Sequence, residues 1–330
     1  MGKPTISEVA QAANVSKATI SRYLNHHYGN MSEATRQRIA KVIAEMGYRP
    51  NRQAQSLKSK RSYLIGVVIA DISNMYSSLL LKGISSVLQT ERYQIMIMNS
   101  ANSLELEHQY LQRLLDQGVE GIILQAISPN IADYQFLQPY DVKVTLVDRP
   151  IKGSDWPLVT SNNYTSTKQL ARLVYETGYD QLTVISEAIN RTITRQVRFQ
   201  AIADTGKALH KRAQLKEVAD QDSFGLEQII SDLVEEPQKN AIFASNGRML
   251  MLTLKAIFNL GLRIPEDIGV TGYDDWSWTE LVGPGITSIE QRPDMIGQKC
   301  AEVILAQIAG ENRMGLTYEL PAELKRRYSL

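Results

Sequence analysis

The sequence predicts an all-α helix-turn-helix head followed by a bilobal α/β core with two doubly wound parallel sheets. Residues 1–61 contain short amphipathic helical patterns and no strand pattern, whereas strand-length apolar segments alternate with amphipathic helices from Ser62 onward. The formal charge changes at the same place: residues 1–61 carry 11 lysines and arginines against 3 acidic residues, and the remaining 269 residues carry 25 against 32. A basic head on an acidic body is expected when only one end of a chain meets a polyanion, although a solvated basic surface is the simpler alternative.

The length and composition are those of a folded protein. A chain of 330 residues predicts two or three domains, and 22% charged residues is an ordinary globular value that argues against wholesale disorder. The single cysteine, Cys300, cannot form an internal disulfide, and the longest apolar run, Leu64–Ala70, is too short to span a membrane. Residues 1–5 show no leader pattern, so we expect a cytoplasmic protein.

The head begins with two short helices. Thr5 and Glu8 form a capping-box pattern before a helix at Ile6–Ala13, and Ser16 is placed to cap a second helix that ends near Leu24. The expected inward face of this second helix comprises Ala18 or Thr19, Ile20, Tyr23 and Leu24. The pattern is therefore helix, short turn, helix.

A third helix begins after Ser32 and ends at Gly47, and Arg49-Pro50 then breaks the pattern. The following segment, Asn51–Leu57, has helical character but almost no apolar face. So short a helix is unstable alone, so we expect it to become ordered only against a partner. Residues 58–61 form a charged linker.

In the core, predicted strands alternate with predicted helices, and the same alternation begins again near Asn162. The expected strands are Tyr63–Ala70, Tyr93–Asn99, Gly121–Gln125, Val142–Val147, Gln181–Ser186, Asn240–Ala244 and Ile268–Tyr273, with weak strands at Thr317–Leu320 and Leu324–Tyr328. The expected helices are Ser73–Gln89, Leu104–Gln117, Thr165–Thr177, Thr194–Leu209, Leu226–Val234, Met249–Leu260 and Asp294–Ala309. Ligands bind beyond the carboxyl ends of parallel strands, so we expect the functional side chains there.

The stretch Thr5–Asn25 resembles the DNA-binding head of the LacI/GalR family of bacterial transcription regulators. On the second helix, Lys17, Ala18, Ser21 and Arg22 are expected to enter a major groove, where cationic and small polar groups read base edges. The residues expected near phosphates or at the helix ends of this interface are Thr5, Ser16, Thr19 and Asn25.

Residues 48–57 resemble the hinge helix of that family. The resemblance rests on Tyr48-Arg-Pro-Asn51 followed by Ala54-Gln55-Ser-Leu57. It implies that two such helices pair across a dimer and that Leu57 wedges between base steps in the minor groove. The alternative is that Leu57 docks onto the core.

The resemblance continues through the core. It rests on the segments 65–74, 146–150, 241–246, 264–275 and 287–291. It implies the fold of periplasmic sugar-binding proteins, with three crossovers between lobes. The implied division is a DNA-binding head at 1–50, a hinge and linker at 51–61, and an effector-binding and dimerisation core at 62–330. Within the core, the N-subdomain would comprise about 62–161 plus 292–320 and the C-subdomain about 162–291 plus 321–330.

Carried over by position, the effector-site residues are Tyr76, Gln125, Asp148, Arg195, Asn246, Asp274 and Gln291, to which we add Arg149 and Trp276. Each of these polar side chains has the alternative of an ordinary loop hydrogen bond. Arg198 stands where the family usually has glycine, which raises a question about local helix packing. Trp276 is expected to stack on a sugar face or to shield the cleft, whereas burial is the better prediction for Trp278.

An acidic effector such as a sugar acid is favoured by the arginines near the proposed cleft, Arg149, Arg191, Arg195 and Arg248. The stretch that contains Trp276-Ser-Trp278 and Gly283-Pro-Gly285 resembles the corresponding stretch in regulators of 2-keto-3-deoxygluconate use. No catalytic, metal or cofactor pattern is visible, since the four histidines lack metal spacing and no phosphate loop occurs. We therefore expect a non-enzymatic, sequence-specific repressor of carbohydrate or sugar-acid genes. The alternatives are a metabolite-binding protein without DNA function and an α/β enzyme.

The symmetry of such a regulator is also predicted. No leucine heptads follow residues 325–330, and in this family tetramers owe their assembly to such a tail, so we expect a homodimer on a palindromic operator.

Overall fold

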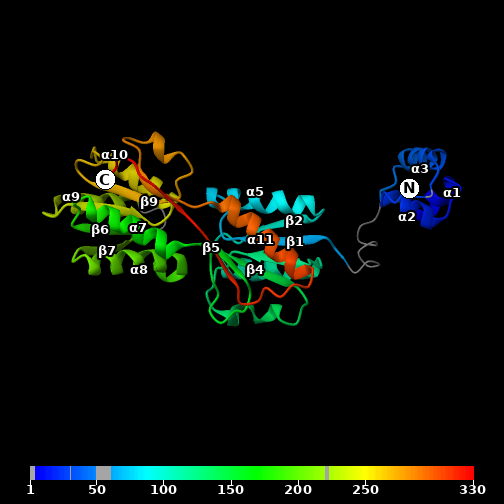
Figure 1. The fold of residues 1–330 in the computed structure, drawn as a ribbon, viewed down its shortest axis with the longest axis horizontal. Coiled ribbons are helices and arrows are strands. Elements are labelled where there is room, and N and C mark those ends of the chain that lie inside the picture. Colours follow the sequence, from blue (N-terminus) through cyan, green and yellow to red (C-terminus); the bar gives the residue numbers. More distant parts are fainter. Residues whose placement is uncertain (1–3, 30, 50–60, 220–222) are drawn as a thin grey trace. The chain divides into compact units, whose positions relative to one another are not determined.

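The computed structural model describes residues 4–29, 31–49, 61–219 and 223–330. The chain divides into two compact units, Met1–Ser62 and Tyr63–Leu330 (Figure 1). Within the described ranges, none of the helices has the length and hydropathy that a membrane span requires.

The first unit is a three-helix head. Helices α1 (Ile6–Ala12), α2 (Lys17–Leu24) and α3 (Glu33–Met46) pack around a small core, and Val9, Ile20 and Ile39 are fully buried in it. The expected caps are present, and Gly47 ends α3 with a φ of 57° that favours glycine. Of the two alternatives for the first inward position of α2, Ala18 is exposed and Thr19 is partly buried, while Ile20 is fully buried.

The first sheet of the core is entirely parallel. Its strands are β1 (Leu64–Ile69), β2 (Gln94–Asn99), β3 (Gly121–Leu124), β4 (Lys143–Val147), β5 (Leu158–Ser161) and β11 (Thr317–Leu320), in the order β11-β5-β4-β3-β1-β2. The helices that accompany it are α5 (Met75–Thr90), α6 (Leu104–Asp116) and α11 (Pro293–Ile308), with the 3-10 turn η1 (Ile131–Leu137).

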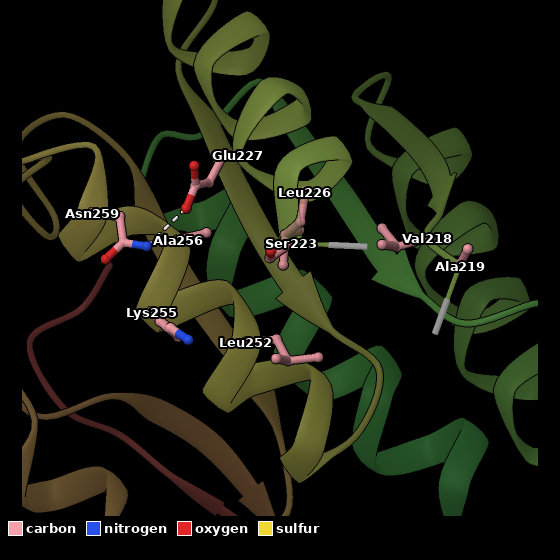
Figure 2. A pocket seen from close by; sticks show the side chains of 9 residues that line it. All are labelled: Val218, Ala219, Ser223, Leu226, Glu227, Leu252, Lys255, Ala256 and Asn259. Carbon is pink, nitrogen blue, oxygen red and sulfur yellow. Dashed lines mark hydrogen bonds between the residues drawn. The ribbon is translucent and has the colours of Figure 1, made fainter. Parts of the chain in front are cut away.

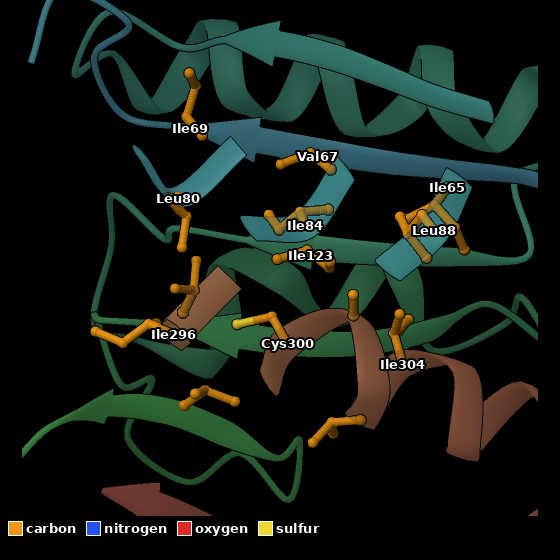
Figure 3. Packing of buried hydrophobic residues seen from close by; sticks show 14 of the residues in the cluster. Ile65, Val67, Ile69, Leu80, Ile84, Leu88, Ile123, Ile296, Cys300 and Ile304 are labelled. Atoms are coloured by element: carbon orange, nitrogen blue, oxygen red, sulfur yellow. The ribbon is translucent and has the colours of Figure 1, made fainter. Parts of the chain in front are cut away.

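The core of this lobe is a layer of aliphatic side chains between β1, α5 and α11 (Figure 3). Ile65, Ile84 and Cys300 are fully buried in it, and burial raises the pKa of the Cys300 thiol, which is therefore inert. Helices α5 and α11 lie side by side (Figure 1). A side chain at Gly83 would collide with the backbone of Asp294, so this close approach requires glycine.

The second sheet repeats the strand order of the first. Its strands are β6 (Gln181–Ser186), β7 (Arg212–Glu217), β8 (Asn240–Ala244), β9 (Gly269–Tyr273), β10 (Thr287–Glu290) and β12 (Glu323–Lys325), in the order β12-β10-β9-β8-β6-β7. Only β12 runs antiparallel to its neighbour. The accompanying helices are α7 (Asn163–Glu176), α8 (Ile193–Ala208), α9 (Ser223–Glu235) and α10 (Gly247–Asn259), with 3-10 turns η2 (Ile189–Arg191) and η3 (Thr279–Leu281). The chain changes sheet three times: after β5, after β10 and after β11.

Three strands, β5, β7 and β10, were not predicted from the sequence pattern. Strand β7 reads Arg-Ala-Gln-Leu-Lys-Glu and is half-buried at the sheet edge, so it has no continuous apolar run. Strands β5 and β10 are four residues long, and each contains at least two polar residues, so neither shows a continuous apolar run. The last strand ends at Lys325 rather than Tyr328, because Arg327 turns to bond Asp275 and the backbone of Ile286.

Candidate functional site

One face of α2 presents the residues expected to read DNA. Lys17, Ala18, Ser21 and Arg22 are all exposed, and their spacing places them on the same side of the helix. Neither Lys17 nor Arg22 forms an ion pair with any residue that the structure describes. The face is therefore a cationic helix surface whose lysine and arginine side chains form no ion pair with the described residues.

The flanking residues of the head build the helix ends. Ser16 Oγ accepts the Thr19 N–H at 3.1 Å, and the Asn25 side chain donates to the Ser21 carbonyl at 2.9 Å. Thr5 caps α1 through a reciprocal bond with Glu8, which holds the pKa of that carboxyl below its usual value. Tyr48 is half-buried after α3. The remaining predicted DNA-binding residues, Asn51, Ala54, Gln55 and Leu57, lie outside the described residues.

In the first lobe, the predicted effector residues follow the carboxyl ends of β3 and β4 or lie on α5. The Gln125 side chain accepts the Ala70 N–H at 3.0 Å, and Arg149 donates to the Ala126 carbonyl at 3.5 Å. Asp148 has a φ of 63°, and its carboxylate accepts no hydrogen bond from the described residues. The hydroxyl of Tyr76 and the Nε of Arg149 are buried and have no partner there either. Burial and the charge of Asp148 raise the pKa of Tyr76, so its hydroxyl remains a hydrogen-bond donor.

In the second lobe, Arg195 and Asn246 are held together by a third residue, Glu187, which the sequence did not indicate. Glu187 Oε2 lies 3.2 Å from Arg195 Nη2 and accepts the Asn246 side-chain amide at 2.9 Å. Asn246 also caps α10 by accepting the Met249 N–H. Burial lowers the pKa of Arg195, and Glu187 opposes that shift. The position of Glu187, directly after β6, was the available signal.

Asp274 follows β9 and is almost completely buried. One carboxylate oxygen accepts the Gly247 N–H at 3.1 Å and the other accepts the Gln291 amide, whose oxygen in turn accepts the Ser161 hydroxyl at 2.6 Å. Burial raises the pKa of Asp274, whereas the Arg198 guanidinium lowers it. The predicted residues Asp274 and Gln291 are thus brought into one network that reaches the crossover after β5.

Arg198 is a further buried residue at the carboxyl ends of these strands. It is 5% exposed, and it donates to the Asn163 side chain at 2.9 Å and to the Ser245 carbonyl at 2.6 Å. Its guanidinium carbon lies 3.5 Å from the centroid of the Tyr273 ring. Helix α8 is continuous around it, so the departure from the family glycine does not disturb the helix.

Two tryptophans differ in their packing. Trp276, with a φ of 45°, packs against the hydrophobic cluster of the first lobe, and its buried indole N–H has no partner among the described residues. A Cβ on Gly247 would lie 2.8 Å from the Trp276 ring, so this contact requires glycine. Trp278 is partly buried and packs on the hydrophobic cluster of the second lobe, which agrees with the prediction of burial.

The strand ends therefore combine charged groups with unsatisfied donors. Four buried polar atoms in this region have no protein partner in the described chain: Tyr76 Oη, Arg149 Nε, Ser186 Oγ and Trp276 Nε1. Buried polar atoms are normally hydrogen-bonded, so these four mark a place where water or a polar ligand can bind. No group of three or more metal-ligating side chains occurs within the ranges that the structure covers.

A separate pocket of about 90 Å³ lies between α9 and α10 (Figure 2). Leu226, Leu252 and Ala256 give it an apolar floor, and Lys255 lies at its side. None of the predicted effector residues lines it. Ala219 and Ser223 also line it, and the residues between them are outside the described ranges, so we assign the pocket no role.

Two family models match the sequence. Residues 5–51 match "Bacterial regulatory proteins, lacI family", and residues 171–330 match "Periplasmic binding protein-like domain". The first match covers the head and the second covers most of the lobe that contains Glu187, Arg195 and Asp274.

Individual relatives match along the whole chain. The HTH-type transcriptional regulator KdgR of Bacillus subtilis (strain 168) is 36% identical over 334 residues, which covers 100% of this chain and 98% of the relative. The ribose operon repressor of the same organism is 30% identical over 318 residues, 96% of this chain and 95% of that repressor. Among solved structures, a lac repressor dimer bound to operator and the anti-inducer ONPF superposes with a TM-score of 0.86 at 22% identity and 99% coverage of both chains.

Proposed function

The chain belongs to the lacI family of bacterial regulatory proteins, which are DNA-binding transcriptional regulators rather than enzymes, and we propose that it is a repressor controlled by a sugar acid. The observation that carries the effector class is the strand-end cluster. It contains the guanidinium groups of Arg149, Arg195 and Arg198 beside buried polar atoms that have no protein partner. Hydroxyl groups of a sugar satisfy such atoms, and a carboxylate forms strong, often bidentate, charge-assisted hydrogen bonds with guanidinium groups.

DNA recognition is assigned to the exposed face of α2. Lys17 and Arg22 are unpaired within the described head, so they are available to base edges or phosphates of a major groove. A homodimer would place two heads on the half-sites of a palindromic operator. We expect the protein to act in the cytoplasm, where that operator lies.

The effector is expected to act through the relative positions of the two lobes. The predicted hinge, residues 51–57, would respond because so short a helix depends on its partner in the dimer. A coupling of 5- to 150-fold between effector and operator affinity is usual for such regulators. The predicted division into head (1–50), hinge and linker (51–61) and core (62–330) assigns one role to each part.

The test of DNA recognition is an operator-binding titration with Arg22→Ala. We expect this variant to lose about 10- to 100-fold in specific affinity, because a bidentate arginine contact discriminates strongly between bases. Lys41→Ala on α3 is the matched control, since Lys41 is exposed and lies 3.8 Å from Glu45. It should change the affinity by less than about threefold. A wild-type protein that prefers no two-fold symmetric duplex over random fragments would overturn the proposal.

The test of the effector class is calorimetry on the full chain. Gluconate, glucuronate and 2-keto-3-deoxygluconate serve as acidic probes, and glucose and ribose as neutral probes. We expect binding of at least one acid and a loss of at least tenfold in Arg195→Ala. Binding of neutral sugars alone would overturn the sugar-acid assignment while leaving DNA recognition intact.

A further inference from the structure

We propose that Arg198 is a specificity-determining residue that binds the carboxylate of the effector. This inference deepens the proposed function, because it rests on an effector that carries an acid group. It assigns the acid preference to one named side chain outside the set expected from the sequence.

The first observation is that the Arg198 guanidinium is buried without a counter-ion in contact. It is 5% exposed, and its two hydrogen bonds go to neutral acceptors, the Asn163 amide oxygen and the Ser245 carbonyl. Within the described chain, no carboxylate lies within ion-pair distance of it. A buried charge that lacks a contacting counter-ion is costly, and an anionic ligand would remove much of that cost.

The second observation is the location of this charge. Asn163 begins α7, Ser245 follows β8 and Tyr273 ends β9, so Arg198 spans three elements at the carboxyl edge of the second sheet. Ser245 is followed in the chain by Asn246, and Tyr273 is followed by Asp274; both following residues belong to the candidate site. The guanidinium therefore lies at the edge of the sheet where parallel α/β folds bind ligands.

The third observation is that two neighbouring charged groups, Arg195 and Asp274, are already engaged. Arg195 is paired with Glu187 at 3.2 Å, and both oxygens of Asp274 accept hydrogen bonds from the protein. Among the described residues, Arg149 also has no ion pair, and its one hydrogen bond there, to the Ala126 carbonyl, is long at 3.5 Å. Of the three arginines, Arg198 is thus held by the most contacts with the described protein, and a pre-placed group lowers the entropic cost of binding a ligand.

The electrostatic influence of Arg198 extends to both lobes. Its charge lowers the pKa of Asp274 and opposes the upward shift in the pKa of Tyr76. It also contributes to the lowered pKa of Arg195. Tyr76 comes from α5 of the first lobe, so the field of Arg198 covers the groups that would surround a ligand.

The competing explanation is a purely structural bracket between α7, β8 and β9. The experiment must therefore separate charge from packing. We would measure the binding of gluconate and 2-keto-3-deoxygluconate to the full-length wild type and to Arg198→Gln, Arg198→Met and Arg198→Lys by calorimetry. Thermal unfolding without ligand reports whether each variant is folded.

We expect Arg198→Gln and Arg198→Met to bind the acids about 10- to 100-fold more weakly. Arg198→Lys keeps the cation and should remain within about fivefold of the wild type. Ser166→Ala is the matched control, because Ser166 bonds the hydroxyl of Tyr273 beneath the guanidinium at 2.8 Å and carries no charge. It should leave acid binding within about threefold of the wild type.

The outcomes are distinguishable. A wild type that binds neutral sugars but no acid overturns the effector class itself. A wild type that binds acids, combined with equal losses in the Lys and Gln variants or no loss in the Gln variant, overturns the role of Arg198 alone. Failure of both neutral variants to fold would make Arg198 a structural cation and would also overturn the proposal.

Discussion

The two lobes place an aspartate at the same point of the same topology and use it differently. Asp148 follows β4 and Asp274 follows β9, the corresponding strands of two sheets with one strand order. Both residues have a left-handed backbone, with φ values of 63° and 72°. Asp274 is 3% exposed and accepts two protein hydrogen bonds, whereas the Asp148 carboxylate accepts none from the described residues.

The difference separates a structural position from a ligand position. In the second lobe, Asp274 fixes the start of α10 and the crossover residue Gln291, so the protein itself satisfies the carboxylate. In the first lobe, Asp148 and the nearby Tyr76 keep their polar atoms unpaired by the protein. We infer that the second lobe is pre-organised and that the first lobe supplies more of the groups that a ligand completes.

The largest effect is expected when the two aspartates are replaced by alanine. Asp274→Ala leaves the Gly247 N–H and the Gln291 amide without partners and should lower the free energy of unfolding by about 2–4 kcal/mol. Asp148→Ala should cost less than about 1 kcal/mol beyond the strain of alanine at positive φ, which both variants share. Urea unfolding of the ligand-free protein measures both values.

For ligand binding, the order of the two variants should be the opposite of their order in stability, with the larger loss in Asp148→Ala. Asp148→Ala is expected to abolish measurable binding of the sugar-acid probe at concentrations that saturate the wild type, because no other group replaces its acceptor oxygens. Equal losses of stability in the two variants would contradict the distinction between the lobes.

The next effect concerns a buried acid of the first lobe whose position holds an apolar residue in the second lobe. Glu107 is the fourth residue of α6, and the fourth residue of the corresponding helix α9 is the buried Leu226. Glu107 accepts the Tyr134 hydroxyl at 2.6 Å and the Ile127 N–H at 3.0 Å, and it thereby ties the segment after β3 to α6. Burial raises its pKa to about 7, although both hydrogen bonds oppose the shift.

This raised pKa predicts a pH-dependent stability. Between about pH 4.5 and pH 7, the folded state keeps a proton on Glu107 that the unfolded state has released, so stability falls as the pH rises. The total loss above pH 7 should be about 2–3 kcal/mol relative to pH 4.5. Glu107→Gln should remove this part of the pH dependence, measured as the difference between the two proteins in urea unfolding from pH 5 to pH 8. Parallel curves would show that Glu107 is ionised throughout.

Much of this architecture follows from local patterns, and the rest does not. The caps at Thr5, Ser16 and Ser32 and the continuous apolar strands of the core are local signals, and the structure confirms them within a few residues. Strand β7 was missed because its edge position removes the apolar run that marks a buried strand.

The partners within the site depend on contacts between distant residues. Asp148, Arg195 and Asp274 could be identified because they stand near strand ends or in a family motif. Glu187 and Asn246 are 59 positions apart, and Arg198 and Ser245 are 47 apart, so no local pattern reports that they touch. For the same reason, sequence alone could not show that Asp274 is satisfied and Asp148 is not.

The smallest effects are expected from removing one hydroxyl in each lobe. The Tyr76 hydroxyl is buried without a partner among the described residues, whereas the Tyr273 hydroxyl bonds Ser166 at 2.8 Å. Tyr76→Phe should therefore leave the free energy of unfolding unchanged or raise it by up to about 1 kcal/mol, and Tyr273→Phe should lower it by about 1 kcal/mol. In calorimetry, Tyr76→Phe should weaken sugar-acid binding about three- to tenfold and Tyr273→Phe by less than twofold. Because each change deletes a single oxygen and keeps the ring, a larger binding loss in Tyr273→Phe than in Tyr76→Phe would contradict the inference that the first lobe supplies more of the groups that a ligand completes.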